Sequence, residues 1–347
     1  MCHAVALGYM RRGWCVLNVG IVVNERCQAS SVFAVTDLLI AANYTLNRYF
    51  ETSEPLFNYQ LMGLKGSVQA YNGIQIGSVA KIQDCKRPDV LILPGAFESI
   101  LAASHAQKLL TKMSRLSDTL KAWHKAGTTI ASVCTGSFIL ASSGVSEGRS
   151  LTCHWASEKT ANELFPNELF ETDKLLIDHG DIISAGGAMA VSQLVLYLVY
   201  RFHSRELAVA TGKLMMIELN LNNQSRFAIF RPNTQHKDLL VTKLQKIIET
   251  TFKEGPDISG FAINEGIGER QLGRRFKKAT GETPLSYLQR FRVEQVKIGL
   301  ESTSRAINNL IWDVGYEDPT SFRRLFKRLT GLTMQEYRSR FSTMGQV

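Results

Sequence analysis

A cysteine in the middle of the chain has the surroundings of a nucleophile. Cys134 lies in the motif Ser-Val-Cys-Thr-Gly, between a strand pattern that begins at residues 129–131 and a helical pattern over residues 137–143. A cysteine at such a strand-to-helix turn sits at a helix N-terminus, where backbone N–H groups and the helix dipole favour a thiolate. His154, in the motif Leu-Thr-Cys-His-Trp, is a candidate base partner. Gly95 ends another strand pattern, in a turn whose amides could hold an anion.

Two segments near the C-terminus share the layout of a helix-turn-helix unit. Residues 261–281 and 307–331 each contain an apolar-periodic helix, a turn with glycine, and a basic helix that ends at Thr-Gly. In each basic helix, two apolar residues spaced four apart predict a buried stripe with the intervening arginines facing outward. These pairs are Leu272 with Phe276 and Phe322 with Phe326. One basic amphipathic helix is usually a solvated face. Two with the same layout, separated by a helical pattern over residues 284–300, favour a DNA-binding module.

The two basic helices begin differently. Asp318 is a good N-cap and Pro319 suits the first helical position, so the second helix has a sharp start. The first helix begins at Gly268, which has no side chain for capping and whose backbone freedom opposes helix formation. We therefore expect the second basic helix to be the better ordered of the two.

The positive charge is concentrated in the part that holds these units. The net charge is +9, and residues 236–347 carry 19 Lys and Arg against 13 Asp and Glu, whereas the preceding part carries 21 against 18. This balance suits a polyanionic partner. The six cysteines form no Cys-x-x-Cys pair, so we expect no structural zinc and no disulfide framework. We expect no cofactor either. The sequence contains no run of about 18 consecutive apolar residues, so we expect no membrane span. We expect a cytoplasmic bacterial protein that is associated with the nucleoid.

Strand and helix patterns divide the chain into two domains. Five strand patterns that alternate with helical ones lie at residues 16–23, 59–64, 90–94, 129–133 and 181–185. Such alternation is typical of an α/β domain with a largely parallel sheet. A polar stretch then breaks the pattern, and everything after it is helical. The predicted parts are an extension over residues 1–15, an α/β domain over 16–219, a linker over 220–238 and a helical domain over 239–343.

The helical region resembles the AraC/XylS-type DNA-binding domain over about a hundred residues. Residues 281–292 match the helix between the two motifs of that family, and residues 314–323 match its most specific stretch. The resemblance implies base contacts from Arg270, Arg274, Thr320, Arg323 and Arg324. It implies phosphate contacts from Lys277, Lys278, Lys327 and Arg328. Gly268 and Gly273 depart from the family pattern, so the first unit is expected to discriminate less.

The α/β region resembles the class I glutamine amidotransferase-like superfamily, in the intracellular-protease-like branch that is fused to AraC-type modules. The motifs that carry the resemblance hold Cys134, His154 and Gly186, and they imply a flavodoxin-like sandwich. Ser31 stands where related enzymes have an acid, and Gln193 stands where the fused branch often has Asp. The triad is therefore incomplete, and we expect a vestigial Cys134 and His154 rather than an enzyme. The resemblance implies an effector pocket that contains Ser31, Gly95, Cys134, His154 and Gly186.

Together these observations predict a sequence-specific transcription regulator. It would bind double-stranded promoter or operator DNA as a homodimer and respond to a small-molecule effector held by the N-terminal domain, with RNA polymerase as a further candidate partner. One alternative is a cysteine-dependent hydrolase or amidotransferase-like enzyme that uses the helical domain as a nucleic-acid tether. The other is a scaffold that dimerises and binds nucleic acid without sequence preference.

Overall fold

The chain folds into two compact units. The computed structural model describes residues 16–50, 52–219, 223–230, 232–234 and 236–342. The predicted extension over residues 1–15 lies outside these described residues. The units are Met1–Gln224 and Ser225–Val347, so the division falls inside the segment predicted as a linker. Parts of that segment are packed: Gln224 is buried in the first unit, and Phe230 lies against Tyr287 in the second.

A mostly parallel sheet forms the centre of the first unit. Among the described residues, seven strands form one sheet in the order β5-β2-β1-β6-β7-β9-β8, and β3 pairs with β4 separately. Their bounds are β1 Leu17–Val22, β2 Phe57–Gly63, β3 Val68–Gln69, β4 Gln75–Ile76, β5 Ala80–Lys81, β6 Val90–Leu93, β7 Thr129–Val133, β8 Leu176–Asp178 and β9 Ile182–Ala185. Neighbours in the large sheet pair in parallel except β8, which runs antiparallel to β9. The predicted parallel α/β fold is confirmed.

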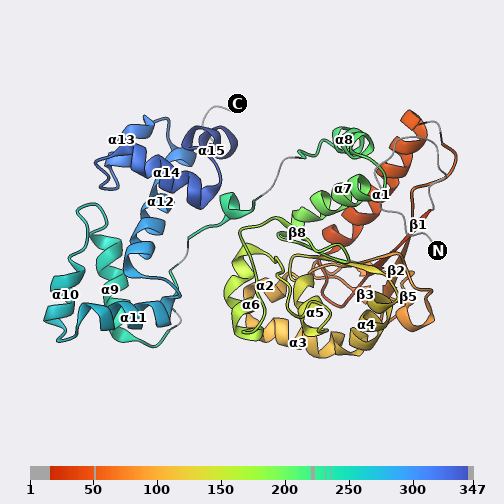
Figure 1. The fold of residues 1–347 in the computed structure, drawn as a ribbon, viewed down its shortest axis with the longest axis horizontal. Coiled ribbons are helices and arrows are strands. Elements are labelled where there is room, and N and C mark those ends of the chain that lie inside the picture. The colour runs from red at the N-terminus through yellow and green to blue at the C-terminus, as the bar shows by residue number, and fades with distance from the viewer. Residues whose placement is uncertain (1–15, 51, 220–222, 231, 235, 343–347) are drawn as a thin grey trace. The chain divides into compact units, whose positions relative to one another are not determined.

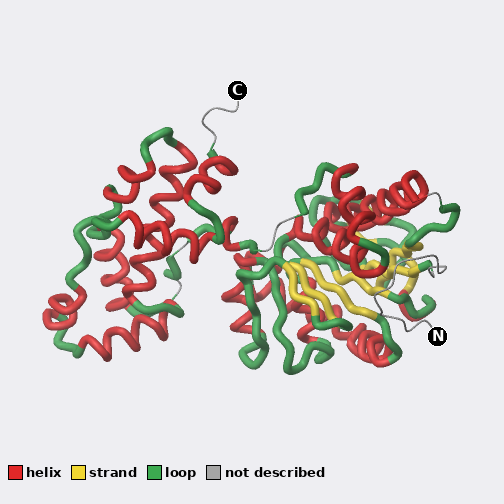
Figure 2. Tube along the Cα trace, turned by 45° about the horizontal axis from the view of Figure 1, so that its top comes forward, coloured by secondary structure: helices red, strands yellow, loops and turns green. Residues whose placement is uncertain are grey.

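Helices cover both faces of this sheet (Figure 1). Their bounds are α1 Ala29–Phe50, α2 Glu98–Leu101, α3 Ala103–Met113, α4 Ser117–Lys125, α5 Gly136–Ser142, α6 Glu158–Leu164, α7 Val191–Phe202 and α8 Arg205–Leu214. Successive residues of β6 serve opposite cores: Val90 and Ile92 pack with α1, α7 and α8, while Leu91 and Leu93 pack with helices of the other face. Figure 2 shows the strands between the two helical layers. A strand buried on both sides explains the continuous apolar run of β6.

Helix α1 is long and apolar, and it is a core helix of the unit. By length and composition alone it could cross a membrane, but 61% of its most apolar window is buried inside the domain. Val32, Val35 and Leu39 are among its fully buried side chains. Its hydrophobicity is therefore accounted for by packing against the sheet.

The second unit is helical and has two cores joined by one long helix. Its helices are α9 Leu239–Thr250, α10 Ile258–Asn264, α11 Glu269–Thr280, α12 Pro284–Ser302, α13 Ile307–Trp312, α14 Pro319–Thr330 and α15 Met334–Phe341. The start of α12 packs with α9, α10 and α11 through Tyr287 and Leu288, and its second half packs with α13, α14 and α15 through Val296 and Leu300. Each basic helix ends at a left-handed glycine, Gly281 or Gly331. The predicted all-α domain with two helix-turn-helix units is confirmed.

Candidate sensing site and DNA-binding surface

Cys134 occupies a strained turn between β7 and α5. Its φ of 58° lies in the left-handed region, which costs a non-glycine residue free energy. Two neighbouring strand ends hold the turn. The Cys134 amide donates to the Ala185 carbonyl over 2.9 Å, and the Thr135 hydroxyl donates to the Ala96 carbonyl over 3.0 Å. Gly95 packs directly on this turn, because a Cβ there would lie 2.9 Å from the Cβ of Cys134. The predicted strand-to-helix turn is confirmed.

The expectation that this turn favours a thiolate is wrong. Cys134 is only 1% exposed, and burial raises the pKa of its thiol to about 12, against the opposing effect of hydrogen bonds from Thr135. Helix α5 has only seven residues, and its N-terminal dipole does not offset the loss of hydration that an anion would suffer here. Cys153 is buried as well, and burial also raises its pKa. At neutral pH both sulfurs are therefore thiols, which are poor nucleophiles.

His154 is neutral and held by the backbone. Its Nδ1 accepts a hydrogen bond from the Ala156 amide over 3.1 Å, so the proton of the neutral ring lies on Nε2. Burial lowers the pKa of His154 below its usual value. The ring lies beside Trp155, with 5.4 Å between centroids. Within the described part of the chain no carboxylate hydrogen-bonds to His154, so it lacks the orienting acid that a catalytic base normally has.

The structure gathers the predicted pocket residues at the edge of the sheet where β1, β6, β7 and β9 end. The hydroxyl of Ser31 donates to the Ala188 carbonyl over 3.4 Å, just after the motif that contains Gly186. A Cβ on Gly187 would lie 3.9 Å from Cδ2 of His154. All of the five predicted residues except His154 are buried. This carboxyl edge is where open α/β sheets hold their ligands.

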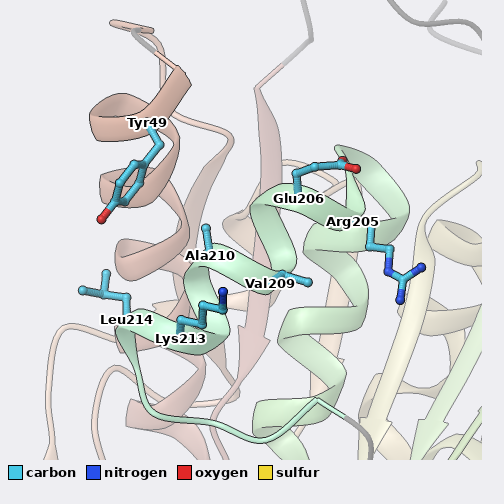
Figure 3. A pocket seen from close by; sticks show the side chains of 7 residues that line it. All are labelled: Tyr49, Arg205, Glu206, Val209, Ala210, Lys213 and Leu214. Carbon is cyan, nitrogen blue, oxygen red and sulfur yellow. The ribbon is translucent and has the colours of Figure 1, made fainter.

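A separate open groove lies at the other end of α1. The groove has a volume of about 790 Å³ and is lined by one residue of α1 and six residues of α8 (Figure 3). These residues are Tyr49, Arg205, Glu206, Val209, Ala210, Lys213 and Leu214. None of the predicted pocket residues lines it, and Tyr49 lies roughly 27 Å along the helix axis from Ser31 at 1.5 Å per residue. No three His, Cys, Asp or Glu side chains of the described residues gather to hold a metal ion.

In the second unit, α11 and α14 each present a basic outer face. Leu272, Phe276, Phe322 and Phe326 have essentially no exposed surface, which confirms the predicted buried stripes. The nine residues that the sequence suggests for DNA contact are all exposed: Arg270, Arg274, Lys277, Lys278, Thr320, Arg323, Arg324, Lys327 and Arg328. They form two corresponding sets, one on each basic helix. Each of these helices follows a short helix and a turn, as recognition of a major groove requires.

The starts of these helices differ as the sequence predicts. The Asp318 carboxylate accepts hydrogen bonds from the Thr320 amide over 2.8 Å and the Ser321 amide over 3.2 Å. Gly268 caps α11 with no side-chain hydrogen bond. Two of the orphan amides at the start of α14 are thus satisfied by the protein, whereas those of α11 are left to solvent or DNA.

The two turns are also anchored differently. Gly266 and Gly315 both have left-handed backbones, with φ of 68° and 76°. An added Cβ on Gly266 would meet open space, whereas Gly315 lies directly against the Lys253 carbonyl in the turn that follows α9. Arg292 of α12 reinforces this second contact, because its Nε donates to the Phe252 carbonyl over 2.7 Å and its guanidinium lies over the Tyr316 ring. The second turn is therefore anchored to the segment that follows α9, whereas the first turn has no such contact at its glycine.

Two side-chain contacts on the basic helices were not anticipated. Arg275 of α11 donates to Asp238, the N-cap of α9, over 2.5 Å, and this hydrogen bond lowers the pKa of Asp238. Arg323 of α14 donates to Asn308 over 2.6 Å, which orients its guanidinium. The partners are 37 and 15 residues away in sequence, so no local pattern reveals them.

Comparison with known proteins supports the same division of the chain. Residues 261–340 match the model of a helix-turn-helix domain, and residues 23–200 match the DJ-1/PfpI family. The chain is 26% identical to the HTH-type transcriptional regulator GbdR of Pseudomonas aeruginosa, over 92% of this chain and 84% of that protein. It is 24% identical to the HTH-type transcriptional regulator GlxA of Rhizobium meliloti, over 87% of this chain and 94% of that one.

A solved structure is similar to the first unit. It is described as a transcriptional regulator protein from Vibrio parahaemolyticus, and it matches 58% of this chain and all of its own with a TM-score of 0.50 and 17% identity. At that identity the match supports the fold alone.

The fold and the basic surface define a helix-turn-helix transcription regulator of the AraC type with an α/β N-terminal domain. The chain belongs to the DJ-1/PfpI family, whose model covers just over half of it. The predicted relation to AraC-type regulators with an amidotransferase-like domain is confirmed.

Proposed function

We propose that the helical unit reads an operator with both basic helices. Arg270 and Arg274 of α11, and Thr320, Arg323 and Arg324 of α14, contact base edges, while Lys277, Lys278, Lys327 and Arg328 contact phosphates. The observation that carries this proposal is the exposure of all nine side chains on two helices with the same architecture. The two helices would enter successive major grooves about 34 Å apart, and a homodimer would double the site.

The first unit, in this proposal, binds the effector at the carboxyl edge of its sheet. Ser31, Gly95, Cys134 and Gly186 form the packed wall, and His154 is the half-buried polar group that a ligand can reach. We expect amino acids or small amines, screened against the full chain by thermal shift, to include a stabilising compound. Binding at 100 times Kd should stabilise the fold by about 2.7 kcal/mol. His154→Ala should abolish that shift and Arg324→Ala should keep it. A shift that survives His154→Ala would place the effector elsewhere.

The domain is proposed to sense rather than to catalyse. Its left-handed Cys134 favours the enzyme alternative, but the thiol is buried, and burial raises its pKa to about 12. Cys134→Ala keeps the Cβ on which Gly95 packs, so we expect operator affinity to change by less than about twofold, within the ordinary effect of a small buried substitution. Hydrolysis of an amide or ester substrate by the wild type that disappears in Cys134→Ala would favour the enzyme instead.

The domain boundaries follow the same proposal. The division between the two units falls between Gln224 and Ser225, inside the polar stretch over residues 220–238. Because connecting segments have the lowest local stability, limited proteolysis with a broad-specificity protease should cut within residues 220–238 first. A first cut inside residues 16–219 would contradict this boundary.

We further infer that the regulator works in the bacterial cytoplasm and contacts RNA polymerase at the promoter.

A further inference from the structure

One glutamine of the connecting segment is buried inside the sensing unit. Gln224 is 1% exposed, and its side-chain amide is fully hydrogen-bonded. Oε1 accepts from the Trp155 amide over 3.2 Å. Nε2 donates to the Cys153 carbonyl over 2.7 Å, to the Lys174 carbonyl over 3.1 Å and to the Thr152 hydroxyl over 3.2 Å. A solvated linker glutamine would make none of these contacts.

These partners belong to the candidate sensing site. Cys153 and Trp155 flank His154, the one half-buried residue of the predicted pocket. On the other side the amide lies directly on Gly186, because a Cβ added there would be 2.7 Å from Cδ of Gln224. Gln224 therefore fills the space between the His154 motif and the Gly186 motif.

The residues that follow Gln224 are held by the DNA-binding unit. The 3-10 turn η5, Ser225–Phe227, packs against the recognition helix α14, and Phe227 meets Phe341 edge to face. Farther along, Lys297 of α12 donates to the Ala228 carbonyl over 2.6 Å, and the Phe230 amide donates to Glu294 over 3.1 Å.

These two anchors are adjacent in the sequence. Gln224 is bound in the first unit, and the next three residues form the turn η5 that contacts α14, the helix that carries Arg323 and Arg324. Because Ser225, the first residue of η5, directly follows Gln224, we expect a displacement of Gln224 to act on η5 through the backbone.

We propose that Gln224 is a latch that couples the sensing site to α14. An effector that occupies the space over Gly186 displaces the Gln224 amide, loosens η5 and changes the order of the second recognition helix. Gln224 acts as a positioning residue and touches neither operator nor promoter. The inference rests on the proposed division of labour between the two units and specifies how they communicate.

Adjacent glycines provide a test that needs neither effector nor DNA. Gly186→Ala places a methyl group where the side-chain amide of Gln224 lies, and so mimics a bound effector. Gly187→Ala adds a Cβ that is no closer than 3.9 Å to any neighbour, and it serves as the matched control. Gln224→Ala removes the latch without a clash. All variants are made in the full chain, and their thermal unfolding is compared with the wild type.

The readout is amide hydrogen exchange in peptides over residues 223–230 and 319–330. Gly186→Ala and Gln224→Ala should each accelerate exchange about tenfold or more over residues 223–230 and about threefold or more over 319–330, with α11 unchanged, because local opening spreads first to the element that η5 contacts. Gly187→Ala should match the wild type. The double variant Gly186→Ala with Gln224→Ala should add nothing to either single change.

Several results would overturn the latch. Exchange over residues 319–330 that stays at the wild-type rate in Gln224→Ala excludes coupling to α14, and equal acceleration in α11 and α14 indicates general destabilisation. If Gly186→Ala fails to fold, Gln224→Ala decides alone. Because no DNA is present, failure of the latch leaves the proposed DNA contacts standing, and their failure leaves the latch standing.

Discussion

Replacing Gly315 with alanine is expected to unfold the second helix-turn-helix unit and abolish specific DNA binding. A methyl group at this position would lie 2.7 Å from the Lys253 carbonyl carbon and closer still to its oxygen, and the φ of 76° is unfavourable for alanine. The carbonyl cannot retreat easily, because it lies in the turn after α9, next to the Phe252 carbonyl that Arg292 holds. Backbone strain alone costs about 1–3 kcal/mol, so strain and clash together should cost more than about 3 kcal/mol of unfolding free energy.

The first helix-turn-helix unit provides the matched control for this substitution. Gly266 has the same backbone conformation, with φ of 68°, but no neighbour within 4 Å of an added Cβ. Gly266→Ala should therefore cost only the left-handed strain, about 1–2 kcal/mol. Thermal unfolding and DNA binding of both variants separate the two effects. Equal destabilisation by Gly266→Ala and Gly315→Ala would show that the contact with Lys253 does not lock the second turn.

Arg324→Ala should reduce sequence preference more than Arg270→Ala. Arg324 projects from a helix that begins with the Asp318 cap, whereas Arg270 projects from the first turn of a helix capped only by Gly268. If Arg324 makes a bidentate base contact, its loss should cost about 1–3 kcal/mol of discrimination between operator and scrambled DNA. A less ordered helix must lose more conformational entropy on binding, so Arg270 should contribute less.

Lys327→Ala serves as the control for a phosphate contact. It should weaken binding to all sequences and lower the slope of log affinity against log salt by about one. Measuring the three variants on operator and scrambled duplexes at two salt concentrations distinguishes the roles. If Arg270→Ala loses sequence preference while Arg324→Ala keeps it, the first helix-turn-helix unit, and not the second, contributes more to sequence preference.

Local chemistry made much of this structure predictable from the sequence. The Asp318-Pro319 start and the Thr-Gly ends define α14 closely, because caps act within one turn of the backbone. The strand-to-helix turn at Cys134 was recognisable for the same reason. Spacing of Phe322 and Phe326 was enough to place the basic side chains of α14 on its outer face.

What was not predictable depends on packing between distant residues. The thiolate expectation for Cys134 failed because burial, not the short helix, sets its pKa, and burial is a property of the assembled sheet. Gln224 sits in a polar stretch that resembles a solvated linker, yet its partners lie 50 to 72 residues earlier. The antiparallel β8 is three residues long, too short for its own periodicity to reveal its direction.

The central claim is that this chain is a sequence-specific DNA-binding regulator, and a specificity ratio tests it most directly. The full chain is used to select duplexes from a random pool, and its affinity for the selected sequence is compared with that for a scrambled sequence at about 50 and 200 mM salt. We predict at least about 10³-fold tighter binding to the selected duplex, together with a steep loss of affinity on both duplexes as salt rises. Equal affinity for the two duplexes at both salt concentrations would contradict the account and favour the nonspecific scaffold.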